Sequence, residues 1–148
     1  MNVLASKAQL RASFFRWALV MVPLVLLIGY IAVQLGGPDT AWFAGLGKPA
    51  IFPPPAAFGI VWPILFVMIG AALALVASAW GAMGRGLALA VFAVHFLGTQ
   101  AWTAVFFGMQ DMQAGLIVLG YGVVSLLIAL VLIWRVRRVA GLLLLPYL

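Results

Sequence analysis

The sequence predicts an all-α integral membrane protein, and three observations carry that prediction. Of the 148 residues, 68% are hydrophobic and only 7% are charged, whereas about 25% of the residues in a soluble domain are charged. The apolar residues fall in long runs, and the basic residues fall at the ends of these runs. Because that placement is typical of membrane topology, the net charge of +6 does not indicate a nucleic-acid partner.

Four apolar runs are each long enough to cross a bilayer as a helix, which takes about 20 residues. The first run follows a basic head and is too long for a typical signal peptide, so we expect it to be retained. The last ten residues are apolar but too short to span alone. We expect them to form a truncated fifth helix packed against the first two, and we leave open that the natural chain runs further. The predicted spans of this single transmembrane domain, 1–148, are about 17–35, 57–80, 87–107 and 114–134, with a partial span at 139–148.

The basic residues predict which way the chain crosses the membrane. If the N-terminus is cytoplasmic, then the head, the turn at 81–86 and the turn at 135–138 lie inside and carry seven of the eight cations. Lys48 and the two acidic residues, Asp39 and Asp111, then lie outside. Since cytoplasmic segments are enriched in Lys and Arg, we expect a multi-pass protein of the bacterial inner membrane with its N-terminus in the cytoplasm.

A proline-aromatic segment, Trp42 to Trp62, separates the first two spans. Four prolines within Pro49–Pro55 exclude a helix or central strand there and favour an extended backbone. A short helix over 41–46, capped by Asp39 or Thr40, is expected before them. Aromatic side chains and one cation surround the prolines, so we interpret the segment as a lid over a pocket. Its candidate ligand-binding residues are Trp42, Phe43, Lys48, Pro49, Phe52, Pro53, Pro54, Phe58 and Trp62.

A polar and aromatic face on the third span is the second part of the candidate site. Residues that recur at helical spacing share one side of a helix, and here they are His95, Thr99, Trp102 and Phe106. We interpret this face as a cavity wall on which His95 hydrogen-bonds a ligand, with ligation of haem iron as a less favoured reading. The alternative is a structural histidine bonded to a neighbouring helix.

The four predicted spans contain no Asp, Glu, Lys or Arg. Ion-coupled transporters and proton relays usually carry such residues inside the membrane, and a Ser-His-Asp triad needs a carboxylate beside its histidine. The chain also has no cysteine, which removes thiolate nucleophiles and cysteine metal sites. We therefore expect no catalytic residues, no metal site and no obligatory cofactor, and an enzyme is the less favoured class.

Three motifs in this order resemble the translocator protein family (tryptophan-rich sensory protein, peripheral-type benzodiazepine receptor homologues). They are W-F-A-G-L-x-K-P-x-x-x-P-P from Trp42, W-x-x-x-F-F-G at Trp102 to Gly108, and L-L-x-P-Y-L at Leu143 to Leu148. The resemblance covers about 17–148. It implies a five-helix bundle, often dimeric, that binds porphyrins and other hydrophobic ligands in a cavity roofed by the first loop.

The chain also departs from the pattern of that family. The family commonly has a tryptophan where this chain has Ile51, and another aromatic residue where it has Ala56. The usual glutamine and asparagine of the third helix align with His95 and Thr99. These departures weaken any tetrapyrrole chemistry attributed to tryptophans.

Small residues on the spans bear on assembly. Gly70, Ala74 and Ser78 follow one another at four-residue spacing on the second span, and Gly86 and Ala90 begin the third. Such residues permit close helix contacts in lipid, either within the bundle or between two chains. With the family resemblance, we expect a homodimer.

From these features we expect a membrane receptor or sensor that binds a porphyrin-like or other flat hydrophobic ligand inside the bundle, with haem or porphyrin as ligand and a role in regulating tetrapyrrole metabolism. Membrane lipid is its other expected partner. Three alternatives stay open: a transporter of tetrapyrroles or other hydrophobic molecules, a porphyrin-degrading enzyme, and a ligand-free structural subunit.

Overall fold

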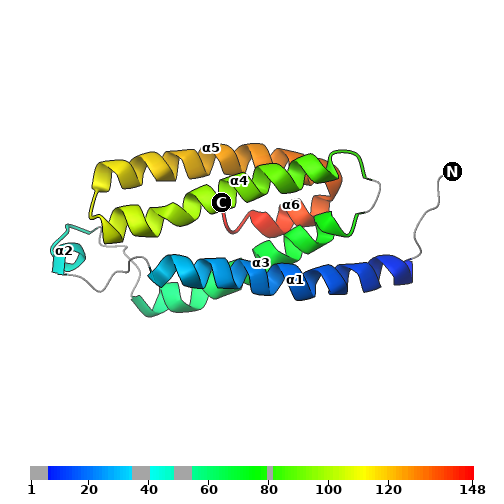
Figure 1. Cartoon of the computed structure of the whole chain (residues 1–148), viewed down its shortest axis with the longest axis horizontal. Coiled ribbons are helices and arrows are strands. Elements are labelled where there is room, and N and C mark those ends of the chain that lie inside the picture. Colours follow the sequence, from blue (N-terminus) through cyan, green and yellow to red (C-terminus); the bar gives the residue numbers. More distant parts are fainter. Residues whose placement is uncertain (1–6, 35–40, 49–54, 80–81) are drawn as a thin grey trace.

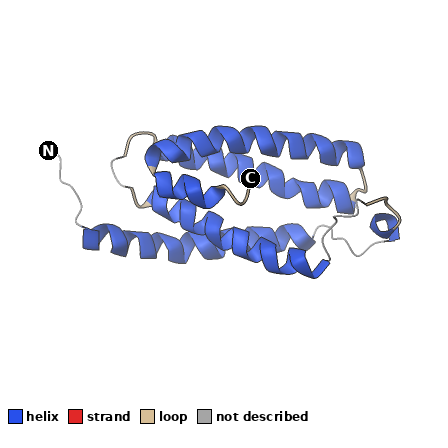
Figure 2. Cartoon of the chain, turned by 180° about the vertical axis from the view of Figure 1, so that it is seen from behind, coloured by secondary structure: helices blue, strands red, loops and turns tan. Residues whose placement is uncertain are grey.

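The computed structural model describes residues 7–34, 41–48, 55–79 and 82–148, and every regular element within these ranges is a helix (Figures 1 and 2). A π-helical turn, η1 (Ala104–Gly108), directly continues α4. The α-helices are α1 (Lys7–Gln34), α2 (Ala41–Ala44), α3 (Pro55–Ala77), α4 (Arg85–Thr103), α5 (Met112–Val136) and α6 (Arg138–Leu144).

Four segments are long and apolar enough to cross a membrane, namely Arg11–Gln34, Gly59–Ala77, Arg85–Gly108 and Met112–Val136. Large apolar side chains are exposed on all four, as with Leu19 at 76% and Ile117 at 67%. A soluble protein rarely exposes such continuous apolar surface, whereas lipid solvates it. The structure thus supports the sequence-based prediction of a multi-pass membrane protein.

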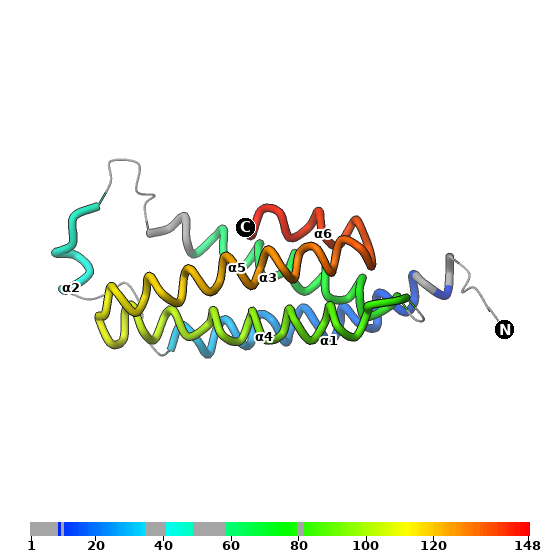
Figure 3. Tube along the Cα trace, turned by 90° about the horizontal axis from the view of Figure 1, so that it is seen from above, coloured from blue at the N-terminus to red at the C-terminus, as the bar shows by residue number. Residues whose placement is uncertain are grey.

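The long helices form two antiparallel pairs, α1 with α3 and α4 with α5, and α6 packs against α3 and α5 (Figures 1 and 3). The short last helix therefore contacts the second span, as expected, but its other main neighbour is the fourth span rather than the first. The reason is the corner before it, where the single extended residue Arg137 (φ −144°, ψ 115°) separates α5 from α6. A one-residue corner folds α6 back onto the helix that precedes it.

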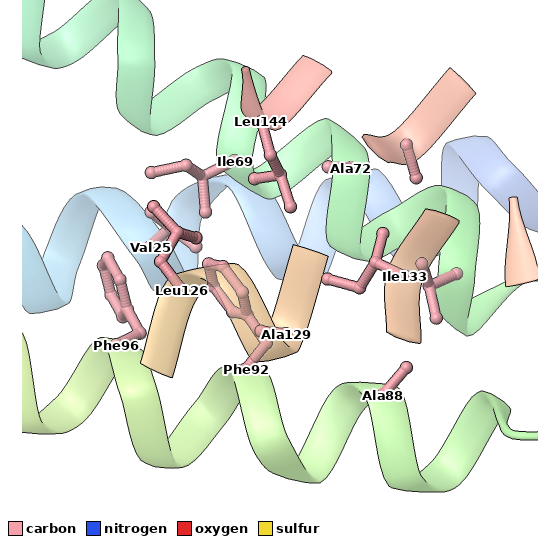
Figure 4. Close-up of a cluster of buried hydrophobic side chains, with 12 residues drawn as sticks. Val25, Ile69, Ala72, Ala88, Phe92, Phe96, Leu126, Ala129, Ile133 and Leu144 are labelled. Atoms are coloured by element: carbon pink, nitrogen blue, oxygen red, sulfur yellow. The ribbon is translucent and has the colours of Figure 1, made fainter. Parts of the chain in front are cut away.

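The core is shared by all five of these packed helices. Its largest fully buried side chains include Phe92 of α4, Ile69 of α3, Ile133 of α5 and Leu144 of α6, and Val25 of α1 joins them (Figure 4). Inside a bilayer the outside of the bundle is as apolar as its core. Such a core therefore stabilises the bundle through close van der Waals packing rather than through transfer out of water.

The small-residue stripe of α3 is buried within the chain. A Cβ placed on Gly70 would lie 2.6 Å from the Cα of Val22 in α1, and Ala74 and Ser78 are 0% and 1% exposed. Gly70 therefore serves the α1–α3 contact, and the whole stripe is covered within one chain. Gly86 and Ala90, in contrast, are exposed on α4.

Several helix boundaries differ from the predicted spans, for identifiable reasons. Helix α1 begins at Lys7 rather than at 17, since the basic head (KAQLR) consists of good helix formers. Helix α3 begins at Pro55, where a missing N–H costs least, and Pro63 lies two turns inside the helix. The Asp111 carboxylate accepts a hydrogen bond from the Ala114 N–H at 2.9 Å and caps α5.

Most of the basic residues lie at one end of the bundle. The start of α1, the α3–α4 connection and the α5–α6 corner lie at one end, and α2 with the η1–α5 turn lies at the other (Figure 1). The first end carries seven cations: Lys7, Arg11, Arg16, Arg85, Arg135, Arg137 and Arg138. We refer to it below as the basic end.

Candidate functional site

Aromatic side chains of α2 contact η1, the π-helical turn that continues α4. Trp42 lies edge-on to Phe106, with ring centroids 5.2 Å apart, and Phe43 lies edge-on to Phe107 at 5.1 Å. On the α4 side, Trp102 stacks on Phe106 at 4.7 Å with the planes 9° apart. We call these five residues the aromatic cluster. They join the segment before the prolines to the tryptophan motif of the third span.

The π-helical turn determines the shape of the cluster. The Met109 N–H donates to the carbonyl of Ala104, five positions earlier, at 2.8 Å. In a regular α-helix, five positions amount to about 1.4 turns, so Phe107 would point well away from Trp102. In η1 both Phe106 and Phe107 contact the Trp102 ring, at 4.7 and 5.3 Å. Such π-turns occur frequently at functional sites.

Lys48 caps the C-terminal end of α2. Its ammonium group donates to the carbonyls of Phe43 at 2.8 Å and Leu46 at 3.3 Å, and it lies 4.6 Å above the Phe43 ring. A cation at a helix C-terminus stabilises the carbonyls exposed there. The lysine side chain is exposed, so the cluster has a positive charge at its edge.

His95 lies elsewhere, in a hydrogen-bonded group between helices. Its side chain is 1% exposed. The Nδ1 atom lies 2.7 Å from Oγ of Ser125 in α5, and Nε2 lies 3.0 Å from the hydroxyl of Tyr147, beyond α6. This arrangement matches the alternative interpretation of a histidine bonded to neighbouring helices. We call these three residues the histidine node.

The directions of the hydrogen bonds in the histidine node follow from the carbonyl of Gly122, which can only accept. The Ser125 hydroxyl is 3.3 Å from the Gly122 carbonyl and donates to it, so its oxygen accepts from the Nδ1–H of His95. A neutral imidazole has one donor and one acceptor, so Nε2 accepts from the Tyr147 hydroxyl. This tautomer is assigned from the network. Both ring nitrogens of His95 are thus satisfied within the chain.

The other sequence-based candidates within the described residues, Thr99 and Trp62, have local partners. The Thr99 hydroxyl donates to the Phe96 carbonyl at 2.9 Å, and its methyl group lies against Gly122. Trp62 is 39% exposed and contacts Phe66 of its own helix at 5.8 Å, apart from the aromatic cluster. Candidates outside the described part of the chain are Pro49, Phe52, Pro53, Pro54 and the side chain of Phe58.

Three residues of these groups were not among the sequence-based candidates. Phe107 lies within the W-x-x-x-F-F-G motif, but α-helical spacing excludes it from the Trp102 face. Tyr147 lies within the L-L-x-P-Y-L motif, and its partner His95 is 52 positions away. No sequence signal pointed to Ser125. Phe107 and Tyr147 thus lie within motifs that the sequence analysis identified, but only the tertiary contacts show which residues they bind.

Comparison with known proteins agrees with the motifs. The chain is 33% identical to the tryptophan-rich protein TspO of Chlorobaculum tepidum over 86% of this chain and 82% of that protein. It is 34% identical to protein CrtK of Rhodobacter capsulatus over 72% of this chain and 68% of that protein. A tryptophan-rich sensory protein of Cereibacter sphaeroides is also 34% identical, over 72% of this chain and 66% of that protein. The model of the TspO/MBR family matches residues 17–148, and this chain therefore belongs to the TspO/MBR family.

Proposed function

We propose that this protein is a membrane receptor or sensor that binds a flat hydrophobic ligand of the porphyrin class at the aromatic cluster. The single observation that carries the proposal is the contact of Trp42 and Phe43 of α2 with Phe106 and Phe107 of η1, two rings that also lie against Trp102 of α4. A planar ligand gains from stacking on such rings. The word "sensory" in the name of one relative is consistent with this role.

In this proposal the cluster is the closed form of the site. The edge-on contacts between α2 and η1 are worth about 0.5–1.5 kcal/mol each beyond buried area, so a stacking ligand can replace them at small cost. Lys48 at the edge provides a positive charge for a ligand carboxylate. The lid role of the proline segment is part of the same proposal.

We propose that His95 does not contact the ligand but holds α4 in place against α5 and against the segment that follows α6. Because both ring nitrogens are bonded to Ser125 and Tyr147, a ligand could reach the imidazole only by displacing one of these hydroxyls. The same bonds disfavour haem ligation through His95. Ligand contact is assigned instead to Trp42, Phe43, Trp102 and Phe106.

The first experiment titrates the purified protein with protoporphyrin IX and follows tryptophan fluorescence and the Soret band. Since a stacking aromatic contributes about 0.5–1.5 kcal/mol beyond area, Trp102→Ala should raise the Kd at least several-fold. Trp134→Ala is the matched control, because Trp134 lies at the basic end, under Arg138. The control should leave the Kd nearly unchanged.

Two outcomes contradict the proposal: equal effects of the two substitutions, or no porphyrin binding by the wild-type protein. The second would favour a ligand-free structural subunit. The remaining alternatives are tested with the same ligand. Net uptake into proteoliposomes would indicate a transporter, and a steady loss of the Soret band would indicate a porphyrin-degrading enzyme.

A further inference from the structure

A hollow on the lipid-facing surface of α1 lies close to the basic end. Its volume is about 310 Å³, and it is lined by Phe15, Ala18, Leu19, Val22 and Pro23. All five lining residues are apolar and come from one helix, so the hollow is a surface groove rather than an interior cavity. Phe15 and Leu19 are 59% and 76% exposed, which leaves the groove open to lipid.

The residues that line the groove lie on two sides of α1, and each side also carries an arginine. Phe15, Ala18 and Val22 follow Arg11 at positions i+4, i+7 and i+11, and residues at such spacing share one side of a helix. Leu19 and Pro23 follow Arg16 in the same way, at i+3 and i+7. Both arginines are exposed. Within the described residues, neither guanidinium has a hydrogen bond or ion pair.

The dimensions fit one leaflet of a bilayer. From Phe15 to Pro23 the helix rises about 12 Å at 1.5 Å per residue, and half of the hydrocarbon core is about 15 Å. An acyl chain in the groove would therefore lie along α1 through most of one leaflet. Its headgroup would then reach the level of Arg16 and Arg11.

We propose that this groove is a binding site for one anionic phospholipid, held by Arg11 and Arg16 at the headgroup and by the apolar walls at the acyl chain. Charge complementarity selects this occupant over a zwitterionic lipid. The acidic residue within the described ranges, Asp111, is the N-cap of α5, at the end of the bundle opposite the start of α1 (Figure 1), so it does not lie beside the two arginines. Both guanidinium groups present donors suited to a phosphate.

The test counts lipids bound to the purified full chain in zwitterionic detergent by native mass spectrometry, with phosphatidylglycerol compared to phosphatidylcholine of the same acyl chains. The variant R11Q/R16Q should raise the Kd for phosphatidylglycerol about tenfold or more, because each basic residue near an anionic headgroup contributes on the order of fivefold. Its affinity for phosphatidylcholine should change little. The matched control is R135Q/R137Q, which removes two charges from the same end but away from the groove.

A second pair of variants tests the acyl-chain part. Leu19→Ala removes one wall and should weaken the binding of both lipids, whereas Leu116→Ala, equally apolar and 68% exposed on α5, should not. Neither side chain belongs to the core, so both variants should fold. The unfolding temperature in detergent without added lipid checks this.

Three results would overturn the site. Equal losses in R11Q/R16Q and R135Q/R137Q would show diffuse attraction by the whole basic end. Equal affinities of the wild-type protein for the two lipids would remove the headgroup selection. Displacement of the lipid by soluble glycerol phosphate at similar concentration would show that the groove adds nothing to a phosphate contact.

Discussion

At the scale of single residues, His95 shows how one polar side chain is accommodated in a bundle that is otherwise apolar. A buried polar group without a hydrogen-bond partner destabilises the fold, because the lipid around the bundle offers no partner in place of water. The node satisfies both ring nitrogens from different elements, Ser125 on α5 and Tyr147 beyond α6. The imidazole therefore ties the end of the chain to the α4–α5 pair.

Substitution of His95 tests this role. His95→Leu leaves two part-buried hydroxyls without their imidazole partner and should reduce the free energy of unfolding by about 1–3 kcal/mol. His95→Gln should be close to wild type, because the amide offers one acceptor and a donor, as neutral histidine does. Thermal unfolding in detergent provides the measurement. A His95→Gln protein as unstable as His95→Leu would contradict the hydrogen-bond account.

The same residues show what the sequence could and could not predict about the site. Helical spacing correctly placed Trp102 and Phe106 on one side of a helix, because that relation is local. It could not pair His95 with Tyr147, 52 positions away. It also grouped Phe106 without Phe107, because a π-turn is not visible in an α-helical period.

At the scale of elements, the close approach of α1 and α3 depends on Gly70. The backbone of Val22 occupies the space that a Cβ at Gly70 would need. A backbone atom cannot move aside as the end of a flexible side chain can. The length and hydrophobicity of these helices could be predicted because both are local properties, but the partner of the small-residue stripe depended on how the helices pair.

Gly70→Ala should therefore destabilise the bundle, by about 1–3 kcal/mol as is typical of overpacking. Gly59→Ala provides the control in the same helix, since its Cβ would meet nothing within 4 Å. That control should be neutral or stabilising by up to about 1 kcal/mol, because alanine is the better helix former. Chemical or thermal unfolding in detergent compares the two, and similar losses in both variants would mean that the α1–α3 contact is not the cause.

At the scale of the whole molecule, the separation of charge predicts orientation. The seven cations of the basic end come from three segments that are far apart in the sequence and meet only in the fold (Figure 1). An end rich in Lys and Arg stays in the cytoplasm during insertion. The homodimer is likewise a prediction about the whole molecule, and since Gly70, Ala74 and Ser78 are buried within one chain, it would have to use another surface.

A reporter fusion tests the orientation. An enzyme reporter that is active only in the cytoplasm, fused after Arg138, should be active, and one fused after Lys48 should be inactive. A reporter that is active only in the periplasm should show the reverse. Periplasmic behaviour after Arg138 would overturn the arrangement of every span.

The π-turn has a consequence for how the third span can change. One extra residue in the turn shifts the phase of all that follows by about 100°, since an α-helix has 3.6 residues per turn. If Val105 were lost, Phe106 and Phe107 would follow Trp102 by three and four positions, and both spacings place a ring on the Trp102 side of a regular α-helix. Phe107 would then take the position, four residues after Trp102, from which Phe106 stacks on that ring, although no aromatic residue had been replaced. The five rings therefore depend on the length of this turn as much as on their own identity.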